Sequence, residues 1–410
     1  MKKSIFCLMV IACVLVHAEV ERKVVQRQRA LVRSGAGLFY PIIAELSQGT
    51  PISVLAEEEG WYKIAVQDSN GYVSTKVTQA ASAGDDPFLR MSSGADVRLS
   101  RHGMSAGVKG FASRFTTAFK GDADFMDVYA SYQLDPADYR AFTRETERRN
   151  PPTAAPLHPL SIRDYFSFSE AGMGIAIASR ISQLGLLQDP DIQTYVNCVG
   201  TRVASASHGY DVGFRFFVLD VDAANAYACP GGIVFVTRGM LQSLNNEAEL
   251  AVILGHEIAH VVLRHGMQEM EKRKHNIKSD DAFAAMEEEF EKMGEPTDAE
   301  YKAVEEELDA MALEIYDTIY QGRMDAYEVE ADSYGTLYAA RAGYKSSVIH
   351  SLLQRLLHSE RGSTNEHYTP EQITGRIKNM RRDTGVDESA NALLLTQRYK
   401  DAIAPLMRGQ

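Results

Sequence analysis

The chain has 410 residues, of which 45% are hydrophobic and 24% are charged. This length and composition allow two or three domains with a substantial core, and they exclude a chain that is disordered over most of its length. The formal net charge is -12 and no basic stripe is present in the sequence. A nucleic-acid partner is therefore not expected, because binding to phosphates requires clustered lysine and arginine.

Residues 1–18 have the pattern of a secretory signal peptide. Lysines near the start are followed by an apolar run over residues 5–16 and by the small residue Ala18, which predicts cleavage after Ala18 and export to the periplasm or the cell exterior. A lipid anchor at Cys13 is disfavoured, because apolar residues follow it where a lipoprotein usually turns polar. No later segment has the roughly 18 consecutive apolar residues of a membrane span, so we expect no transmembrane span in the mature chain.

Two of the four cysteines, Cys7 and Cys13, fall within the predicted signal peptide. Cys198 and Cys229 then remain as the pair in an oxidising compartment. One interpretation is a disulfide between Cys198 and Cys229. The other is two free thiols that pack as small apolar side chains.

Residues 19–80 predict a small all-β domain, because short β-branched and aromatic runs alternate with turns that contain glycine. The segment resembles a bacterial SH3 domain, through VRSGAG at 32–37, GT at 49–50, EEEGWYKI at 57–64 and NGYV at 70–73. The resemblance implies a cell-wall or peptide ligand. Alternatively, Trp61, Tyr62 and Tyr72 fill the barrel core or pack on a neighbouring domain.

The rest of the chain is predicted to be mostly helical. Residues 81–165 have the composition of linkers around a short helical region. Hydrophobic spacing predicts helices near 168–184 and 192–203, while the β-branched and aromatic runs at 214–219 and 233–236 predict two strands of a small sheet. The predicted fold class is therefore α+β, in which a small β-barrel precedes a mostly helical domain with a small sheet.

The most informative motif is HExxH, formed by His256, Glu257 and His260. On a helix the two histidines lie one turn apart on one face, so both imidazoles can bind one metal ion beside Glu257. Asn246 and Glu249 form a capping pattern that predicts the start of this helix. The surrounding residues are too apolar for a solvated histidine pair, and a buried glutamate between two histidines requires a compensating charge.

A catalytic zinc site needs about three protein ligands and one open position, so a third ligand must come from another segment. Residues 325–332 begin a helix-forming stretch that offers several carboxylates. At about 100° per residue, Glu328 and Asp332 lie within roughly 40° of each other, while Glu330 points away from both. We expect Glu328 to be the third ligand and Asp332 to accept a hydrogen bond that orients His256.

This constellation predicts one Zn²⁺ per chain, held by His256, His260 and Glu328. Zinc lowers the pKa of a water ligand toward about 7, and Glu257 can take the proton of that water as it attacks a peptide carbonyl. The same carboxylate can return the proton to the leaving amine.

Several ordered motifs resemble peptidase family M48 over roughly residues 168–380. They are NAYACPGGIVFVTRG at 225–239, EAEL at 247–250, GHEIAHVVLRHG at 255–266, and EVEAD at 328–332 followed by Gly335. The similarity is to the soluble, exported members related to periplasmic quality-control proteases. The chain is unlike the multi-spanning CAAX prenyl proteases and the membrane-embedded heat-shock proteases of the same family.

The resemblance implies a gluzincin-type metallopeptidase domain over residues 166–383, with zinc ligands His256, His260 and Glu328 and the base Glu257. Residues 267–324 would be an inserted helical hairpin, and residues 384–410 a C-terminal tail.

The resemblance also implies that the strand after Pro230 lies at the edge of the cleft, where an extended substrate adds as a further strand. Asn225, Ala226 and Gly232 would then lie near the substrate backbone.

In one place the chain departs from the family pattern. Many relatives carry His-Pro before Arg-Ile, whereas here Thr369 precedes Pro370 and the nearest histidine is His367. His367 and Arg376 are therefore alternative candidates for stabilising the tetrahedral oxyanion. His265 is interpreted as a helix-end cap rather than a ligand.

The predicted function is zinc-dependent endopeptidase activity on envelope or exported proteins, misfolded or unassembled ones in particular. The alternative is an envelope chaperone or binding factor with a latent zinc site that the inserted hairpin blocks. Peptidoglycan hydrolysis is disfavoured, because Cys198 and Cys229 form no Cys/His pattern of a wall hydrolase.

Overall fold

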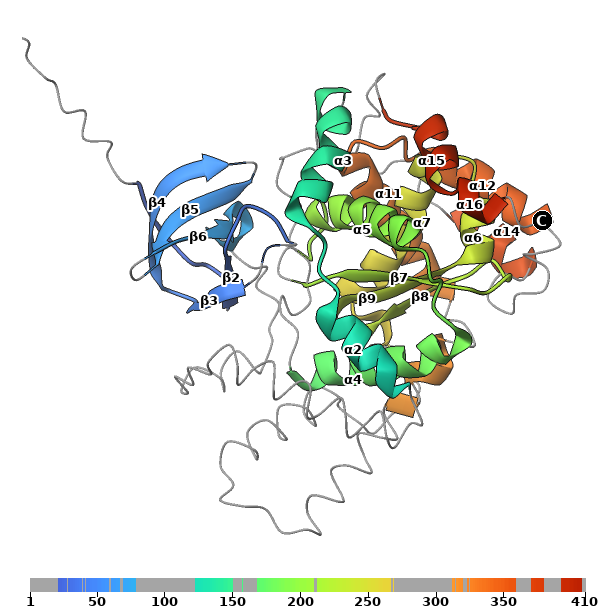
Figure 1. The fold of residues 1–410 in the computed structure, drawn as a ribbon, viewed down its shortest axis with the longest axis horizontal. Helices are drawn as coiled ribbons and strands as arrows, with labels where there is room; N and C mark the ends of the chain where they lie inside the picture. Colours follow the sequence, from blue (N-terminus) through green and yellow to red (C-terminus); the bar gives the residue numbers. More distant parts are fainter. Residues whose placement is uncertain are drawn as a thin grey trace, which may run out of the picture.

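A computed structural model gives the fold of the chain (Figure 1). It describes residues 21–78, 122–149, 168–266, 325–358, 370–379 and 392–407, apart from positions 28, 39, 41, 59, 67, 68, 210 and 211, together with residues 157, 268, 312, 313, 315–319 and 323. Three predicted features lie outside these residues: the signal peptide with Cys13, His367, and most of the inserted segment 267–324.

The N-terminal domain is a six-stranded antiparallel sheet, which confirms the predicted small all-β domain. Its order is β1-β4-β5-β6-β2-β3 and its strands are β1 (Glu21–Val24), β2 (Arg29–Arg33), β3 (Ile42–Ser47), β4 (Pro51–Glu58), β5 (Trp61–Val66) and β6 (Ser69–Ser74), followed by the 3-10 turn η1 (Thr75–Thr78). Strands β1 and β3 were not expected. Both are outer strands without a fully buried side chain, so they lack the alternating hydrophobic pattern that marks a strand.

The barrel packs against the helical domain. Trp61 and Leu38 belong to the same hydrophobic cluster as helix α5 (Pro190–Ser205), while Tyr62 lies in the core of the barrel itself. Tyr72 is partly buried against the cluster shared with α5. The Lys76 ammonium also donates to the backbone carbonyl of Ser207, at 2.5 Å. These aromatic side chains therefore serve as core and domain interface in the structure, as the second interpretation of the SH3-like domain expected.

This interface predicts that the barrel and the helical domain unfold together. Trp61 is the single tryptophan of the chain, so its fluorescence reports on the interface, whereas far-UV circular dichroism reports mainly on the helices. The two denaturant transitions should coincide. Leu38→Ala should lower the free energy of unfolding by about 2 kcal/mol, because it removes a buried side chain. Both transitions should therefore move to lower denaturant concentration.

Leu55→Ala is the matched control, because Leu55 lies in the same barrel but is 46% exposed. Its effect should stay within about 0.5 kcal/mol. A fluorescence transition that precedes the loss of helix in the unmodified protein would show that the two domains unfold separately.

The remaining described elements form one helical domain around a three-stranded sheet, which confirms the α+β fold. The strands are β7 (Arg215–Leu219), β8 (Ala226–Cys229) and β9 (Ile233–Thr237). The helices are α2 (Ala123–Ser131), α3 (Pro136–Arg149), α4 (Phe168–Ile181), α5, α6 (Arg238–Ser243), α7 (Glu247–Val262), α11 (Asp325–Arg341), α12 (Val348–His358), α14 (Pro370–Asn379), α15 (Thr396–Ala402) and α16 (Ala404–Met407), with the 3-10 turns η3 (Ser182–Leu184) and η4 (Pro230–Gly232).

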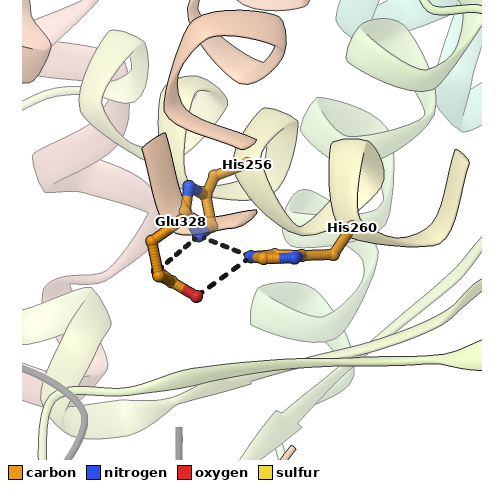
Figure 2. A group of neighbouring side chains, drawn as sticks. All are labelled: His256, His260 and Glu328. Atoms are coloured by element: carbon orange, nitrogen blue, oxygen red, sulfur yellow. Dashed lines mark hydrogen bonds and ion pairs between the residues drawn. The ribbon is translucent and has the colours of Figure 1, made fainter. Parts of the chain in front are cut away.

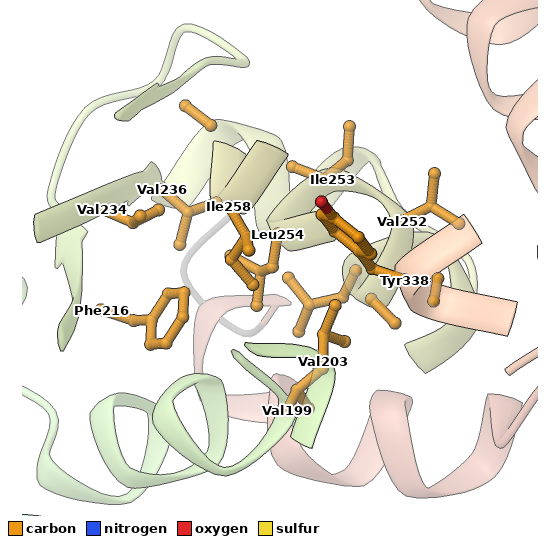
Figure 3. Packing of buried hydrophobic residues seen from close by; sticks show 14 of the residues in the cluster. Val199, Val203, Phe216, Val234, Val236, Val252, Ile253, Leu254, Ile258 and Tyr338 are labelled. Carbon is orange, nitrogen blue, oxygen red and sulfur yellow. The ribbon is translucent and has the colours of Figure 1, made fainter. Parts of the chain in front are cut away.

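The sheet lies between two hydrophobic layers, because successive side chains of each strand point to opposite faces. Phe216 of β7 and Val234 of β9 face a large core shared with α5 and α7, which Figure 3 shows from close by. Phe217 and Phe235 face the other side, where α4 and the α2 residue Phe125 cover them. Helix α7 packs in the first of these cores, and every one of its residues is buried.

The C-terminal segment differs from the predicted tail. Helix α15 packs on the domain, with Tyr399 fully buried and its hydroxyl donating to the Leu241 carbonyl. Arg398 pairs with Glu247 at the start of α7, where Tyr344 also donates to the Glu247 carboxylate at 2.7 Å. Because Leu395 and Tyr399 alone supply little periodicity, the sequence pattern did not indicate these short helices.

The proposed disulfide is not present. Cys198 in α5 and Cys229 at the end of β8 are both free and buried. They pack as small apolar side chains, the second interpretation of the cysteine pair. None of the helices within the described residues combines the length and the hydropathy of a membrane span.

Candidate metal centre

Helix α7 holds His256 and His260 inside the domain. Its start is capped as the sequence predicted, because the Asn246 side chain accepts the Glu249 backbone N–H at 3.0 Å. Every residue of the helix is buried, and His256 and His260 are only 4% and 3% exposed. A solvated histidine pair is therefore excluded.

Helix α11 crosses α7 at a point where both helices carry glycine. A Cβ atom on Gly255 would lie 2.6 Å from the Gly335 carbonyl oxygen, and one on Gly335 would lie 2.5 Å from the His256 backbone nitrogen. Any larger residue would push the two helices apart. This close crossing brings Glu328, on the first turn of α11, to the two histidines.

The three predicted ligands converge on one point (Figure 2). The two histidine Nε2 atoms are 2.9 Å apart, and each lies 3.4 Å from an oxygen of the Glu328 carboxylate. Ligand atoms at zinc distances of about 2.0–2.1 Å in a tetrahedral site are separated by about 3.3 Å. Two nitrogens and one oxygen with this spacing fit a divalent cation with an open fourth position.

The charges in this cluster favour an ionised carboxylate. Burial alone would raise the pKa of Glu328, but hydrogen bonds from His256 and His260 hold it well below its usual value. For His256, burial lowers the pKa, yet the hydrogen bonds to Asp332 and Glu328 raise it to about 9. For His260, burial outweighs the hydrogen bond to Glu328 and holds the pKa well below its usual value. Two imidazole nitrogens and a carboxylate that face one another in this way could together hold a cation.

Glu257 lies next to His256 on α7 and is 5% exposed. Burial raises the pKa of its carboxyl group to about 7, against the opposing charges of His256 and Arg323. A carboxylate with a pKa near neutrality can both accept and return a proton at physiological pH. Glu257 is therefore suited to acid and base chemistry beside the cluster.

Asp332 and Arg376 form a second layer behind the ligands. The Asp332 carboxylate lies 3.0 Å from His256 Nδ1 and accepts two hydrogen bonds from the Arg376 guanidinium, at 2.7 and 2.8 Å. The third guanidinium nitrogen of Arg376 lies 3.3 Å from Glu328. Arg376 thus holds the carboxylates of Glu328 and Asp332 in place, an arrangement that was not predicted. His367, the other candidate for the oxyanion, lies outside the described residues.

The identity of the edge strand was predicted wrongly. The strand after Pro230 is β9, which is the middle strand, because it pairs in parallel with β7 and antiparallel with β8. The outer strands are β7 and β8, and β8, which contains Ala226, packs against α7. Gly232 lies in the turn before β9, at φ 99°, where a side chain would meet Val212.

One edge of strand β8 faces away from β9, and side chains form hydrogen bonds with part of this edge. The Thr237 backbone N–H donates to the Asn225 carbonyl, so by alternation the backbone groups of Ala226 and Ala228 point away from β9. The Asn225 side chain accepts the Ala226 N–H at 2.8 Å, and Arg323 donates to the Ala228 carbonyl at 3.0 Å. Among the described residues, the Ala226 carbonyl and the Ala228 N–H have no hydrogen-bond partner on that edge and could pair with an added strand.

Sequence reasoning missed Arg323 as a residue of the site and interpreted His265 only as a helix-end cap. Arg323 holds the edge of β8, and its Nη1 atom is buried without a hydrogen-bond partner in the part of the chain that the structure describes. His265 is fully buried, and its Nδ1 lies 2.8 Å from Nδ1 of the ligand His260. Arg323 has no spacing signal in the sequence, and His265 follows the left-handed residue Arg264, so the period of α7 does not place it beside His260.

A buried HExxH helix, crossed by a second helix that supplies a glutamate, defines a domain of the metallopeptidase class. Comparison with known proteins agrees. Residues 190–383 match the model of peptidase family M48, and residues 30–79 match the bacterial SH3 domain. Residues 190–383 are therefore similar to peptidase family M48, and the segment before them is similar to a bacterial SH3 domain.

Three relatives illustrate the similarity. The beta-barrel assembly-enhancing protease of Escherichia coli O157:H7 is 35% identical over 91 residues, which are 22% of this chain and 19% of that protein. The putative beta-barrel assembly-enhancing protease of Vibrio cholerae is 29% identical over 171 residues, 42% of this chain and 34% of that protein. Mitochondrial metalloendopeptidase OMA1 of Schizosaccharomyces pombe is 37% identical over 76 residues, 18% of this chain and 23% of that protein. The matches thus span between 19% and 34% of the length of these relatives.

Proposed function

We propose that the protein is a zinc-dependent metalloendopeptidase with one Zn²⁺ per chain, bound by His256, His260 and Glu328. The observation that carries the proposal is the convergence of these three side chains beside the buried carboxylate of Glu257. Two imidazoles and one carboxylate are a ligand set that zinc accepts, and three protein ligands leave one position open, as in catalytic sites.

Zinc, when bound, supplies Lewis-acid polarisation of the scissile carbonyl and activation of the attacking water. Glu257 takes a proton from that water as its oxygen bonds to the carbonyl carbon. The carboxyl then transfers this proton to the nitrogen of the leaving amine as the C–N bond breaks. A pKa of about 7, which burial produces, suits both steps.

An extended substrate is proposed to add to the free edge of β8. The Ala226 carbonyl would accept a substrate N–H, and the Ala228 N–H would donate to a substrate carbonyl, as in β-strand addition. Asn225 and Arg323 hold the neighbouring backbone groups of this edge and so keep the strand in register. Main-chain recognition of this kind accepts many sequences, provided that the polypeptide is unfolded.

The proposed substrates are envelope or exported proteins that are misfolded or unassembled. Two observations support this class: the first residues have the pattern of a signal peptide, and two relatives are named for enhancing β-barrel assembly. The proposed location is the periplasm or the cell exterior. The proposed organisation is a signal peptide over residues 1–18, the SH3-like domain over 19–80, a connecting region over 81–165 and the peptidase domain from residue 166 onward, with 267–324 inserted.

Metal removal tests the proposal directly. We expect the purified mature protein to contain one zinc ion per chain by elemental analysis and to digest an unfolded protein such as casein. A chelator should abolish digestion, and zinc should restore it. His260→Ala should retain no zinc after dialysis, because two remaining ligands bind it far more weakly.

Two results would contradict the proposal. One is an intact, folded protein that binds no zinc. The other is digestion that continues unchanged after the metal has been removed. Zinc binding without any digestion would instead favour a latent site in an envelope binding factor.

A further inference from the structure

Both histidine ligands use their second ring nitrogen in a hydrogen bond, but their partners differ. His256 Nδ1 faces the Asp332 carboxylate at 3.0 Å, whereas His260 Nδ1 faces Nδ1 of another histidine, His265, at 2.8 Å. In metal sites the second nitrogen of a ligand imidazole donates to an acceptor that fixes the orientation and tautomer of the ring. His265 occupies the position of that acceptor for His260.

The positions of the protons follow from the ligand role of His260. A lone pair on His260 Nε2 that faces the metal requires the proton of the neutral ring to be on Nδ1. His260 Nδ1 then donates to His265 Nδ1, so His265 must carry its own proton on Nε2. That atom lies 3.4 Å from the Glu330 carboxylate, which can approach because its side chain is 47% exposed. The chain of donors runs from His260 to His265, whose Nε2 has no hydrogen-bond partner among the described residues and which the Glu330 carboxylate can approach.

A reversal of the backbone brings His265 to this position. On a continuous helix, residues five apart point about 140° away from each other and do not meet. Here α7 ends at Val262, and Arg264 adopts a left-handed conformation at φ 56°. This conformation costs a non-glycine residue roughly 1–2 kcal/mol, so it persists only where the surroundings impose it. The reversal turns the His265 ring back onto His260.

His265 also contacts the helix that supplies the third ligand. Its ring lies against the ring of Tyr327, with centroids 4.6 Å apart, and Tyr327 directly precedes Glu328 on α11. Glu330 lies on the same helix, two residues after Glu328. The fully buried His265 side chain thus connects the end of α7 with the residues before and after Glu328 on α11.

We infer that His265 is a positioning residue of the metal centre: it accepts the His260 Nδ1 hydrogen bond and thereby sets the tautomer and direction of the second ligand, with Glu330 as the outer acceptor. This inference rests on the proposed metal site at His256, His260 and Glu328. It extends that site to a residue that contacts neither the metal nor the substrate.

The test measures zinc affinity by competition with a chromophoric chelator, starting from metal-free protein. His265→Phe keeps a buried ring but removes the acceptor, and we expect zinc to bind about 10–100-fold more weakly. His265→Gln retains an acceptor oxygen and should recover most of the affinity. Glu330→Gln retains an outer acceptor and should change the affinity only a few-fold or less. Cobalt-loaded protein gives a spectroscopic readout, because a misdirected ligand shifts the visible absorption of Co²⁺.

Arg264→Gly is the matched control for the backbone. Glycine adopts the left-handed conformation without strain, so this variant should keep the reversal and bind zinc like the unmodified protein. Thermal unfolding of each metal-free variant shows whether the domain remains folded. If His265→Phe does not fold, His265→Asn takes its place in the comparison with His265→Gln. The shorter asparagine side chain does not reach His260.

The outcomes separate the two proposals. If the unmodified protein binds no zinc, the proposed function fails. If it binds zinc and folded His265→Phe binds equally tightly with an unchanged cobalt spectrum, the inference about His265 fails alone. Equal weakening by glutamine and phenylalanine would also overturn it, because the acceptor would then be irrelevant.

Discussion

Replacing Glu257 with glutamine is expected to lower kcat/KM for an unfolded protein substrate by about 10²–10⁴-fold. Glutamine has nearly the same shape but cannot take a proton from water, so the loss should fall mainly on kcat. Zinc content should remain at one ion per chain, because Glu257 is not among the three converging ligands. The measurement combines steady-state digestion of a labelled unfolded protein with elemental analysis of the same sample.

Glu371→Gln is a suitable control, since Glu371 is exposed at the start of α14. It makes the same chemical change away from the site and should leave kcat/KM unaltered. A rate in Glu257→Gln equal to that of the unmodified protein, with zinc bound, would exclude the proposed mechanism. It would also favour a role as a binding factor.

Replacing Arg376 with methionine is expected to lower the free energy of unfolding by about 3–5 kcal/mol, because it removes one partner of a buried ion pair. Arg376 and Asp332 are 4% and 1% exposed, and they share two hydrogen bonds. Without the guanidinium, Asp332 would remain charged inside the domain and would hold His256 less firmly. Urea unfolding of the metal-free protein measures this loss.

Arg238→Met is the matched control, because Arg238 pairs with Asp220 and Asp222 at the surface, where both carboxylates are largely exposed. The same substitution there should cost less than about 1 kcal/mol. Arg376→Lys should give an intermediate loss, since lysine keeps the charge but cannot form the two-pronged pair. Unchanged stability with a large loss of kcat would instead assign Arg376 to the oxyanion.

The sequence indicated the ligand set because its signals are local. The spacing of His256 and His260 depends only on the period of one helix, and the spacing of Glu328 and Asp332 only on that of another. The capping pattern at Asn246 is equally local. The strands of the barrel core were also predictable, because β-branched and aromatic runs between turns that contain glycine mark them.

Other features carried no local signal. Strands β1 and β3, at the outer positions of the barrel sheet, have mixed exposure, and the helices after Leu395 are too short for a period to emerge. The edge of the small sheet was predicted wrongly, because adjacency to Pro230 does not reveal which strand pairs on both sides.

The sequence by itself therefore determined the proposed chemistry: two imidazoles, one carboxylate ligand and one carboxylate base on helices of known period. Only the tertiary structure decided how that chemistry is supported. Two features join residues far apart along the chain: the crossing at Gly255 and Gly335, and the pairing of Arg376 with Asp332. A third, the reversal at Arg264, joins two residues that a continuous helix would keep apart. Such contacts depend on the packing of whole elements, and no short-range pattern of residue types encodes them.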